Sequence, residues 1–254
     1  MSLRLLTYNI RYGGAGREDA IAEVIASKAP DIAILEEAER PDIVRRLASA
    51  TGMTICGARS GTSLAFLSRV PIARHAWHRP RLVKRAFLEI IPDGIPVRVY
   101  GVHLSAIHSN VTEWRRAYEL RALLKSIGRQ ERAFHVVVGD FNTLAPNEQL
   151  DVRRLPTRLR AIVWATGRAI RWMTIQMMLE AGYVDVYRLR HPADNGFTFP
   201  TWDPHVRLDY AFVPAACADQ AIECEVVHDA RAAREASDHF PLLTGLRTEP
   251  CALD

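Results

Sequence analysis

Short apolar runs rich in β-branched residues alternate along the chain with amphipathic segments. Continuous or alternating apolar character predicts strands, and apolar positions three and four residues apart predict helices. The predicted helices stop at Pro30, Gly52 and Gly128, residues that commonly end a helix. Helices are predicted at 18–29, 41–50 and 111–127. Strands are predicted at 3–10, 32–35, 63–67, 87–91, 97–104, 135–138, 184–189, 197–199, 208–213, 222–227 and 242–246.

The order of these elements predicts two packed sheets. Strands outnumber helices, the helices are dispersed among them, and no repeat or low-complexity linker divides the chain. A chain of 254 residues is within reach of one domain of this kind. We therefore expect a single α/β (α+β) domain over residues 1–254, a four-layer sandwich of two mixed β-sheets flanked by helices.

The composition is that of a globular protein that needs no covalent staples, with 48% apolar and 24% charged residues. Cys56, Cys217, Cys224 and Cys251 are scattered, so we expect thiols in a reducing compartment and neither a zinc site nor a disulfide framework. The chain shows no signal peptide and no apolar run long enough to span a membrane, which predicts a cytoplasmic location. A net charge of +4 permits a phosphate-rich partner without requiring one.

Polar side chains stand at the ends of several predicted strands, as in V-V-G-D-F-N at 137–142. Taken alone, each is more typical of a turn or of a core histidine with its hydrogen bonds satisfied. The set is more informative, because ends brought together by the sheets would form a pocket of carboxylates and imidazoles. Such a pocket suits Mg²⁺ or Mn²⁺ and can move protons near neutral pH. The set comprises Asn9, Glu37, His103, Asp140, Asn142, Asp209, Asp238 and His239.

The pattern resembles the endonuclease/exonuclease/phosphatase superfamily of metal-dependent phosphoesterases. This superfamily includes pancreatic-type deoxyribonucleases, AP endonucleases and neutral sphingomyelinases. The matching stretches follow the family's order over nearly the whole chain, which makes the signal strong for the superfamily and weak for any one substrate. They are T-Y-N-I (7–10), I-L-E-E-A (34–38), L-A-F-L-S-R-V-P-I (64–72), V-H-L-S (102–105), V-V-G-D-F-N (137–142), R-L-D-Y-A-F-V (207–213) and S-D-H-F-P-L (237–242).

The resemblance implies a division between metal ligands and groups that act on water. Asn9 and Glu37 would hold Mg²⁺ or Mn²⁺, and Asp238 would add a ligand. Glu36 stands where the family often has Gln, and we expect it to face away or to support, with Glu37 on the other face of the strand. Asp140 and Asn142 are two residues apart, so both can point into the pocket. By resemblance, Asp140 orients or deprotonates the attacking water and Asn142 donates to a phosphoryl oxygen.

The two histidines complete the implied machinery. Asp209 resembles the carboxylate that holds the imidazole of His239 and raises its basicity. His103 resembles a second pocket histidine that protonates the leaving oxygen or binds phosphate. Water would attack directly, with no covalent intermediate. Pancreatic-type nucleases support the equivalent of His103 with a Glu, whereas residues 83–87 place a cation there, so His103 has another partner or another role.

A basic stretch at about 153–180 departs from the family pattern and is interpreted as a helical insertion. On a helical wheel one face carries Ile and Met, and another carries Arg and Trp. Three interpretations stay open: a helix packed on a sheet, an element that contacts nucleic acid, and a helix at a membrane surface. For the second, the substrate-binding residues would be Arg160, Trp164, Arg168 and Arg171.

These observations favour a Mg/Mn-dependent phosphoric ester hydrolase, most simply a nuclease that cleaves DNA or RNA. The alternatives are a sphingomyelinase-like phospholipid phosphodiesterase and a small-molecule phosphatase. A degenerate relative that only binds is disfavoured, because the whole set of site residues is present. Nucleic acid is the expected partner as substrate, lipid at a membrane surface is the alternative, and no obligate protein partner is inferred.

Overall fold

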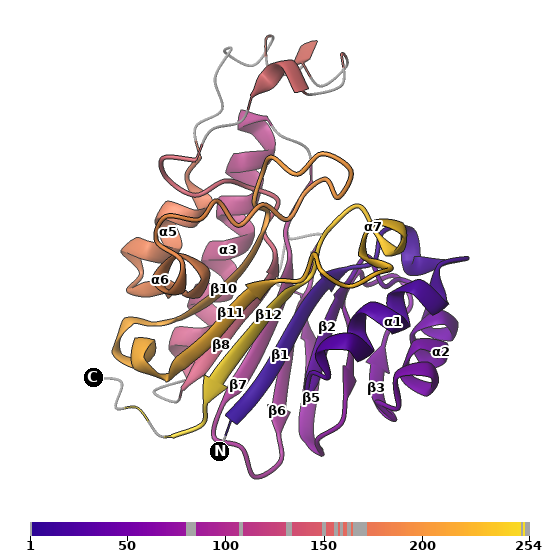
Figure 1. Cartoon of the computed structure of the whole chain (residues 1–254). Coiled ribbons are helices and arrows are strands. Elements are labelled where there is room, and N and C mark those ends of the chain that lie inside the picture. The colour runs from indigo at the N-terminus through magenta and orange to yellow at the C-terminus, as the bar shows by residue number, and fades with distance from the viewer. Residues whose placement is uncertain are drawn as a thin grey trace.

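The computed structural model describes residues 2–79, 85–106, 109–130, 134–148, 151–154, 157, 160, 161, 164, 172–249 and 251. Two six-stranded sheets pack face to face (Figure 1). The first has the order β11 (Ala221–Val226), β12 (Leu242–Arg247), β1 (Ser2–Asn9), β2 (Ile32–Glu36), β4 (Ala65–Ser68) and β3 (Ile55–Ala58). The second has the order β5 (Ile72–His78), β6 (Phe87–Pro92), β7 (Arg98–His103), β8 (His135–Asp140), β10 (Asp209–Pro214) and β9 (Tyr183–Asp185).

Helices cover the outer faces of both sheets, which confirms the predicted sandwich (Figure 1). Beside the first sheet lie α1 (Glu18–Lys28), α2 (Pro41–Thr51) and α7 (Ala233–Ala236). Beside the second lie α3 (Asn110–Gln130) and α5 (Thr174–Glu180), and α6 (Val186–Arg190) packs at the edge against β10 and β11. Short 3-10 turns lie at Tyr12–Gly14, Val152–Arg154 and Ala215–Gln220.

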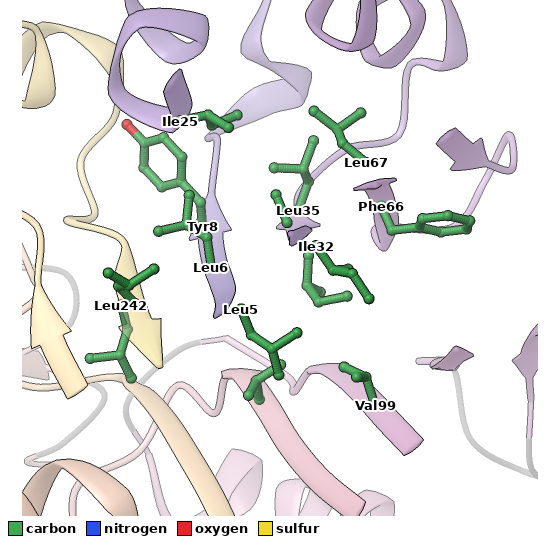
Figure 2. Close-up of a cluster of buried hydrophobic side chains, with 14 of the residues drawn as sticks. Leu5, Leu6, Tyr8, Ile25, Ile32, Leu35, Phe66, Leu67, Val99 and Leu242 are labelled. Carbon is green, nitrogen blue, oxygen red and sulfur yellow. The ribbon is translucent and has the colours of Figure 1, made fainter. Parts of the chain in front are cut away.

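The two faces of β1 serve different layers of the core. Figure 2 shows Leu5 on the side of Val99 in β7, between the sheets, and Tyr8 beside Ile25 of α1. Because side chains alternate along a strand, Thr7 and Asn9 share the inner face with Leu5. The face that buries leucine in the middle of the sandwich therefore presents polar groups at its end.

Strand direction brings the polar strand ends to one end of the sandwich. β1 runs parallel to β2, and β7 runs parallel to β8, so Asn9, Glu36, His103 and Asp140 end strands side by side. β10 runs antiparallel to β8 and begins there with Asp209, opposite Asp140. β12 begins just beyond His239 and pairs antiparallel with β1.

Several predicted elements differ from the structure. The strand predicted at 184–189 is wrong: β9 ends at Asp185, whose carboxylate accepts the backbone N–H of Arg188 at 3.2 Å and caps α6. The strand predicted at 197–199 is only an isolated bridge between Phe199 and Val206. The edge strands β3 and β5 were not predicted, because β3 has only four residues and exposed positions interrupt the apolar pattern of β5.

The cysteines also depart from expectation, since Cys217 and Cys251 form a disulfide with Cα atoms 5.6 Å apart. The pairing joins the turn after β10 to the chain beyond β12, and no local sequence motif signals it. Cys56 and Cys224 remain free thiols. Among the residues that the structure describes, no helix is long and apolar enough to cross a membrane.

Candidate active site

A hydrogen bond joins the two sheets where the polar strand ends meet. Nδ2 of Asn9, at the end of β1, donates to Oδ2 of Asp140, at the end of β8, over 3.0 Å. Both side chains are buried, so each polar atom needs a partner. Oδ1 of Asn9 accepts the backbone N–H of Arg11 at 3.0 Å. The site therefore lies between the sheets and depends on their packing.

The end of β8 turns Asn142 back onto Asp140. The backbone N–H of Asn142 donates to Oδ1 of Asp140 at 2.8 Å, and its Nδ2 donates to Oδ2 at 2.9 Å. This turn needs Asn142 at a positive φ of 53°. Gly139 is required because a Cβ there would lie 2.0 Å from the carbonyl oxygen of Val102. The two polar side chains thus meet through a turn, and not through the strand alternation that the sequence suggested.

Asp209 and His239 form the second part of the cluster. Nδ1 of His239 lies 2.9 Å from Oδ2 of Asp209, and its Nε2 lies 3.9 Å from Oδ2 of Asp140. Asp140, Asp209 and His239 each offer a ligand atom within 4.8 Å of the others, and all three are buried. The structure therefore brings together the carboxylate and imidazole that the sequence paired.

Burial and mutual charge set the protonation of this cluster. Burial raises the pKa of Asp140 to about 7, with the positive His239 opposing the rise and Asp209 adding to it. Burial disfavours a charged His239, but the carboxylates of Asp209 and Asp140 outweigh it and raise its pKa to about 10. His239 is therefore held as a cation beside Asp140 at neutral pH.

His103 also approaches Asp140 and has a different partner. Its Nε2 lies 3.8 Å from Oδ2 of Asp140, and its Nδ1 lies 3.2 Å from Nη1 of Arg85. A guanidinium can only donate, so Nδ1 accepts and the ring proton sits on Nε2. Burial, together with the charges of Arg85 and His239, lowers the pKa of His103 well below its usual value. The cation noted at 83–87 is thus the partner of His103.

The three predicted metal ligands gather around the turn after β1. Oδ1 of Asn9 accepts from the backbone of Arg11, and Oε2 of Glu37 accepts the backbone N–H of Tyr12 at 2.7 Å. Oδ2 of Asp238 lies 3.2 Å from Nε of Arg11. The expectation that Glu37 lies on the strand opposite Glu36 is wrong, because β2 ends at Glu36 and Glu37 has a left-handed φ of 54°.

The donor chemistry of the site fits a hard divalent cation. The available groups are carboxylate, amide and imidazole, with no thiolate among them. Among the described residues, Oδ1 of Asp209 is buried without a hydrogen-bond partner. A buried carboxylate oxygen in that condition is costly unless a cation or water satisfies it.

Two further residues belong to the site and were not predicted as members. Glu36 is completely buried, accepts from Thr7 Oγ1 at 2.5 Å, and has its pKa raised well above the usual value, first by burial and also by Asp209 and Asp140. Its pairing opposite Asn9 in parallel strands would have placed it on the inner face. Arg11 forms an ion pair with Asp238, but its backbone has φ 49°, which no strand pattern signals.

The basic segment lies largely outside the described residues, and so do Arg168 and Arg171. Arg160 is exposed and donates to Thr157 Oγ1 at 3.3 Å, and Trp164 is 66% exposed. The chain just beyond is anchored on α3, because Oε1 of Glu113 accepts the backbone N–H groups of Met173 and Thr174, both at 2.8 Å.

Comparison with known proteins gives a family and a fold. A model of the Endonuclease/Exonuclease/phosphatase family matches residues 6–239. A search of curated protein sequences gives no significant match. Similar solved structures include an endonuclease/exonuclease/phosphatase from Beutenbergia cavernae, with 21% identity, a TM-score of 0.72, and coverage of 97% of this chain and 72% of that one.

Two more neighbours have the same TM-score of 0.72. The 3′ phosphatase NExo from Neisseria, solved with a product DNA hairpin, is 20% identical, with 96% of this chain and 99% of that chain covered. An AP endonuclease from Archaeoglobus fulgidus is 18% identical, with 95% and 98% covered. At such identities the likeness shows the shared fold, and it confirms the predicted architecture.

Proposed function

The chain belongs to the Endonuclease/Exonuclease/phosphatase family, and from that premise we propose that it hydrolyses phosphodiester bonds in nucleic acid with a bound divalent metal ion. The observation that carries this proposal is the buried cluster of Asp140, Asp209 and His239, tied across the sheets to Asn9. Burying two carboxylates and a cationic imidazole together is costly, and such clusters are typical of catalytic sites.

Asp140 is the group that takes the proton from the attacking water. A pKa of about 7 makes its carboxylate a suitable proton acceptor near neutral pH. Asn142 holds that carboxylate in place through two hydrogen bonds. Its Nδ2 also donates to the carbonyl oxygen of Leu104 at 3.2 Å. Both amide hydrogens therefore have acceptors within the protein, and we assign Asn142 a positioning role in place of the predicted donation to phosphate.

His239 is the cation that stabilises negative charge on the phosphoryl group. Asp209 fixes its Nδ1–H, which leaves the Nε2–H directed at the pocket. The neutral His103 presents its own Nε2–H toward the same oxygen of Asp140. Two imidazole donors of different charge would thus face the reacting group.

Asn9, Glu37 and Asp238 are the residues that would hold Mg²⁺ or Mn²⁺. Their contacts support this grouping, because Asn9 and Asp238 contact Arg11 and Glu37 contacts the next residue, Tyr12. When bound, such an ion polarises a phosphoryl oxygen and neutralises charge that develops during P–O cleavage.

Exposed aromatic residues next to the site favour nucleic acid as the substrate. Tyr12 is 79% exposed and follows Arg11 directly. Trp202 is 63% exposed and follows Thr201, whose backbone N–H donates to the carbonyl oxygen of Asp238. Exposed aromatic side chains can stack on unpaired bases. Among the neighbours of known structure, the D. rerio TDP2 protein was solved with a single-strand DNA product.

The experiment that tests this proposal measures hydrolysis of plasmid DNA, single-stranded DNA, RNA, an abasic-site duplex, a phosphomonoester and sphingomyelin in liposomes, with Mg²⁺, Mn²⁺ or EDTA. We expect cleavage of nucleic acid that is lost in EDTA and in Asp140→Asn. The matched control is Asp219→Asn, which neutralises an exposed carboxylate in the 3-10 turn after β10.

Each other outcome assigns a different function. Turnover of sphingomyelin alone would make the protein a phospholipid phosphodiesterase, and turnover of the monoester alone would make it a phosphatase. Nucleic-acid binding without any hydrolysis would identify a relative that only binds.

A further inference from the structure

A cleft lined by arginines lies beside His103, on the side of Arg85. It encloses about 590 Å³, and its lining includes Arg79, Arg85 and Arg115. Among the described residues that line it, Glu39 is the single carboxylate. Hydroxyl groups of Thr62, Ser63, Ser105 and Thr112 form much of the remaining wall. The hydroxyls of Thr62, Ser105 and Thr112 already donate to acceptors within the protein. The arginine N–H groups and their surplus of positive charge are therefore what suits this cleft to an oxyanion.

Arg85 has no carboxylate partner among the described residues, which sets it apart from structural arginines in this protein. Its Nη1 contacts Ser63 Oγ and His103 Nδ1, both at 3.2 Å. No acidic oxygen of the described residues lies within ion-pair distance of its guanidinium. Arg116, by contrast, is fully buried and bonds Glu113 at 2.8 Å. A half-buried guanidinium without an acid retains donors and charge for a ligand.

The other two arginines are also available. Arg79 is exposed and forms no ion pair with the described residues. Arg115 is 46% exposed and approaches Glu119 at 3.3 Å. Glu119 already accepts the N–H and the hydroxyl of Ser105, at 2.9 and 2.7 Å, so it neutralises Arg115 only in part.

The positive wall continues away from the catalytic cluster. A second hollow of about 300 Å³ shares Arg79 and Thr62 with the cleft and adds Arg59 and Trp77 to the lining. Charge therefore follows a path that begins at Arg85, next to His103, and extends outward. A single phosphate group would fill only the start of this path.

We propose that this arginine cleft binds the phosphate next to the scissile phosphate on a nucleic-acid strand. The inference rests on the proposed function and deepens it, because a second phosphate subsite requires a substrate with consecutive phosphates. Arg85 lies at the junction, since it contacts His103 and also lines the cleft. Contacts from Asp140 to His103 and from His103 to Arg85 therefore lead from the catalytic cluster into the cleft.

The first test is binding of a fluorescent single-stranded oligonucleotide in EDTA, measured by anisotropy. The double variant Arg79→Gln/Arg115→Gln leaves Arg85 and His103 intact. We expect its Kd to rise about tenfold, because the variant removes two charge-assisted hydrogen-bond donors from the cleft. The control is Arg45→Gln, an exposed arginine on α2, which should leave Kd unchanged. An unchanged Kd in the double variant would overturn the proposal.

The second test uses chemistry at the phosphate itself. A methylphosphonate beside the cleaved linkage removes one negative charge from the strand. On this oligonucleotide the wild-type KM should rise about tenfold, and the double variant should cause no additional rise, because both changes remove the same interaction. Hydrolysis of bis(4-nitrophenyl) phosphate, which has one phosphate, should be unaffected in the double variant.

Three results would contradict the proposal that the cleft binds a second phosphate. The first is an additive rise in KM when the methylphosphonate and the double variant are combined. The second is an equal loss of activity on bis(4-nitrophenyl) phosphate. The third is weaker binding of the double variant to anionic lipid vesicles with no change in its affinity for the oligonucleotide. Absence of hydrolysis by the wild-type protein would overturn the proposed function, and the anisotropy comparison would still decide the cleft.

Discussion

Two histidines approach Asp140, and they differ in the contact at Nδ1. Nε2 of His103 and Nε2 of His239 lie 3.8 and 3.9 Å from the same oxygen of Asp140, and both rings are buried. At Nδ1, however, His239 meets the carboxylate of Asp209, whereas His103 meets the guanidinium of Arg85.

The surrounding charges shift the pKa values of the two imidazoles in opposite directions. Burial disfavours the charged form of both rings. For His239 the adjacent carboxylates prevail and the pKa rises to about 10, whereas for His103 the adjacent Arg85 acts with burial and the pKa falls. Burial and residue type therefore do not assign a role to a histidine. The role of each histidine depends instead on the group that contacts its Nδ1.

Removing the carboxylate between the two histidines has the largest expected effect. Asp140→Asn should lower kcat about a thousandfold or more, because it removes the proposed proton acceptor while keeping the volume and hydrogen-bonding shape. Circular dichroism should show an unchanged fold. A rate near that of the wild type would show that another group activates the water.

On the Asp209 side, His239→Ala should lower kcat by about 10²–10³, the usual cost of losing one donor that stabilises transition-state charge. The pH profile gives a finer test. A raised pKa means that His239 stays protonated as pH increases, and activity that needs the cation falls only as pH approaches about 10. Asp209→Asn should move this alkaline fall to lower pH, and an unmoved profile would exclude the pair.

On the Arg85 side the expected loss is smaller. His103→Ala removes one hydrogen bond to a charged group, worth about 1.5–3 kcal/mol, so kcat/KM should fall about ten- to a hundredfold. His103→Gln keeps an N–H donor without any titratable charge and should recover part of the loss. If Gln is as poor as Ala, His103 acts as an acid, and the neutral assignment is wrong.

The smallest effect is expected from the basic segment, where Arg160 is exposed and Arg168 and Arg171 lie outside the described residues. Changing all three to Gln should weaken binding to single-stranded DNA and reduce the slope of log K against log salt by about 0.7 for each phosphate that these arginines neutralise. Chemistry on bis(4-nitrophenyl) phosphate should not change. An unchanged slope would favour the interpretation of this segment as structural packing.

The hydrophobic pattern predicted the two-sheet fold. The polar residues at strand ends predicted most of the site residues that the structure brings together. Asn9, His103, Asp140 and Asp209 sit at strand ends, where a local pattern is enough to propose them. Arg85 and Arg11 could not be assigned in the same way. Their contacts depend on loop backbone and on packing between segments far apart in the chain.

The same limit explains the errors. Asp185 caps a helix that strand-like composition concealed, and Glu37 leaves its strand through a left-handed residue. Asp185 accepts the backbone N–H of Arg188, three residues further along the chain, and Glu37 accepts that of Tyr12, 25 residues before it. Hydrophobic periodicity carries no information about such bonds.

The most direct test of the difference between the two sides is an NMR titration of the imidazole nitrogens in the metal-free protein. The ¹⁵N shifts report both protonation and tautomer. We expect His103 to remain neutral with its proton on Nε2 between about pH 6 and 8, and His239 to remain doubly protonated over the same range. A His103 that titrates near its ordinary pKa, or carries its proton on Nδ1, would contradict the role given to Arg85.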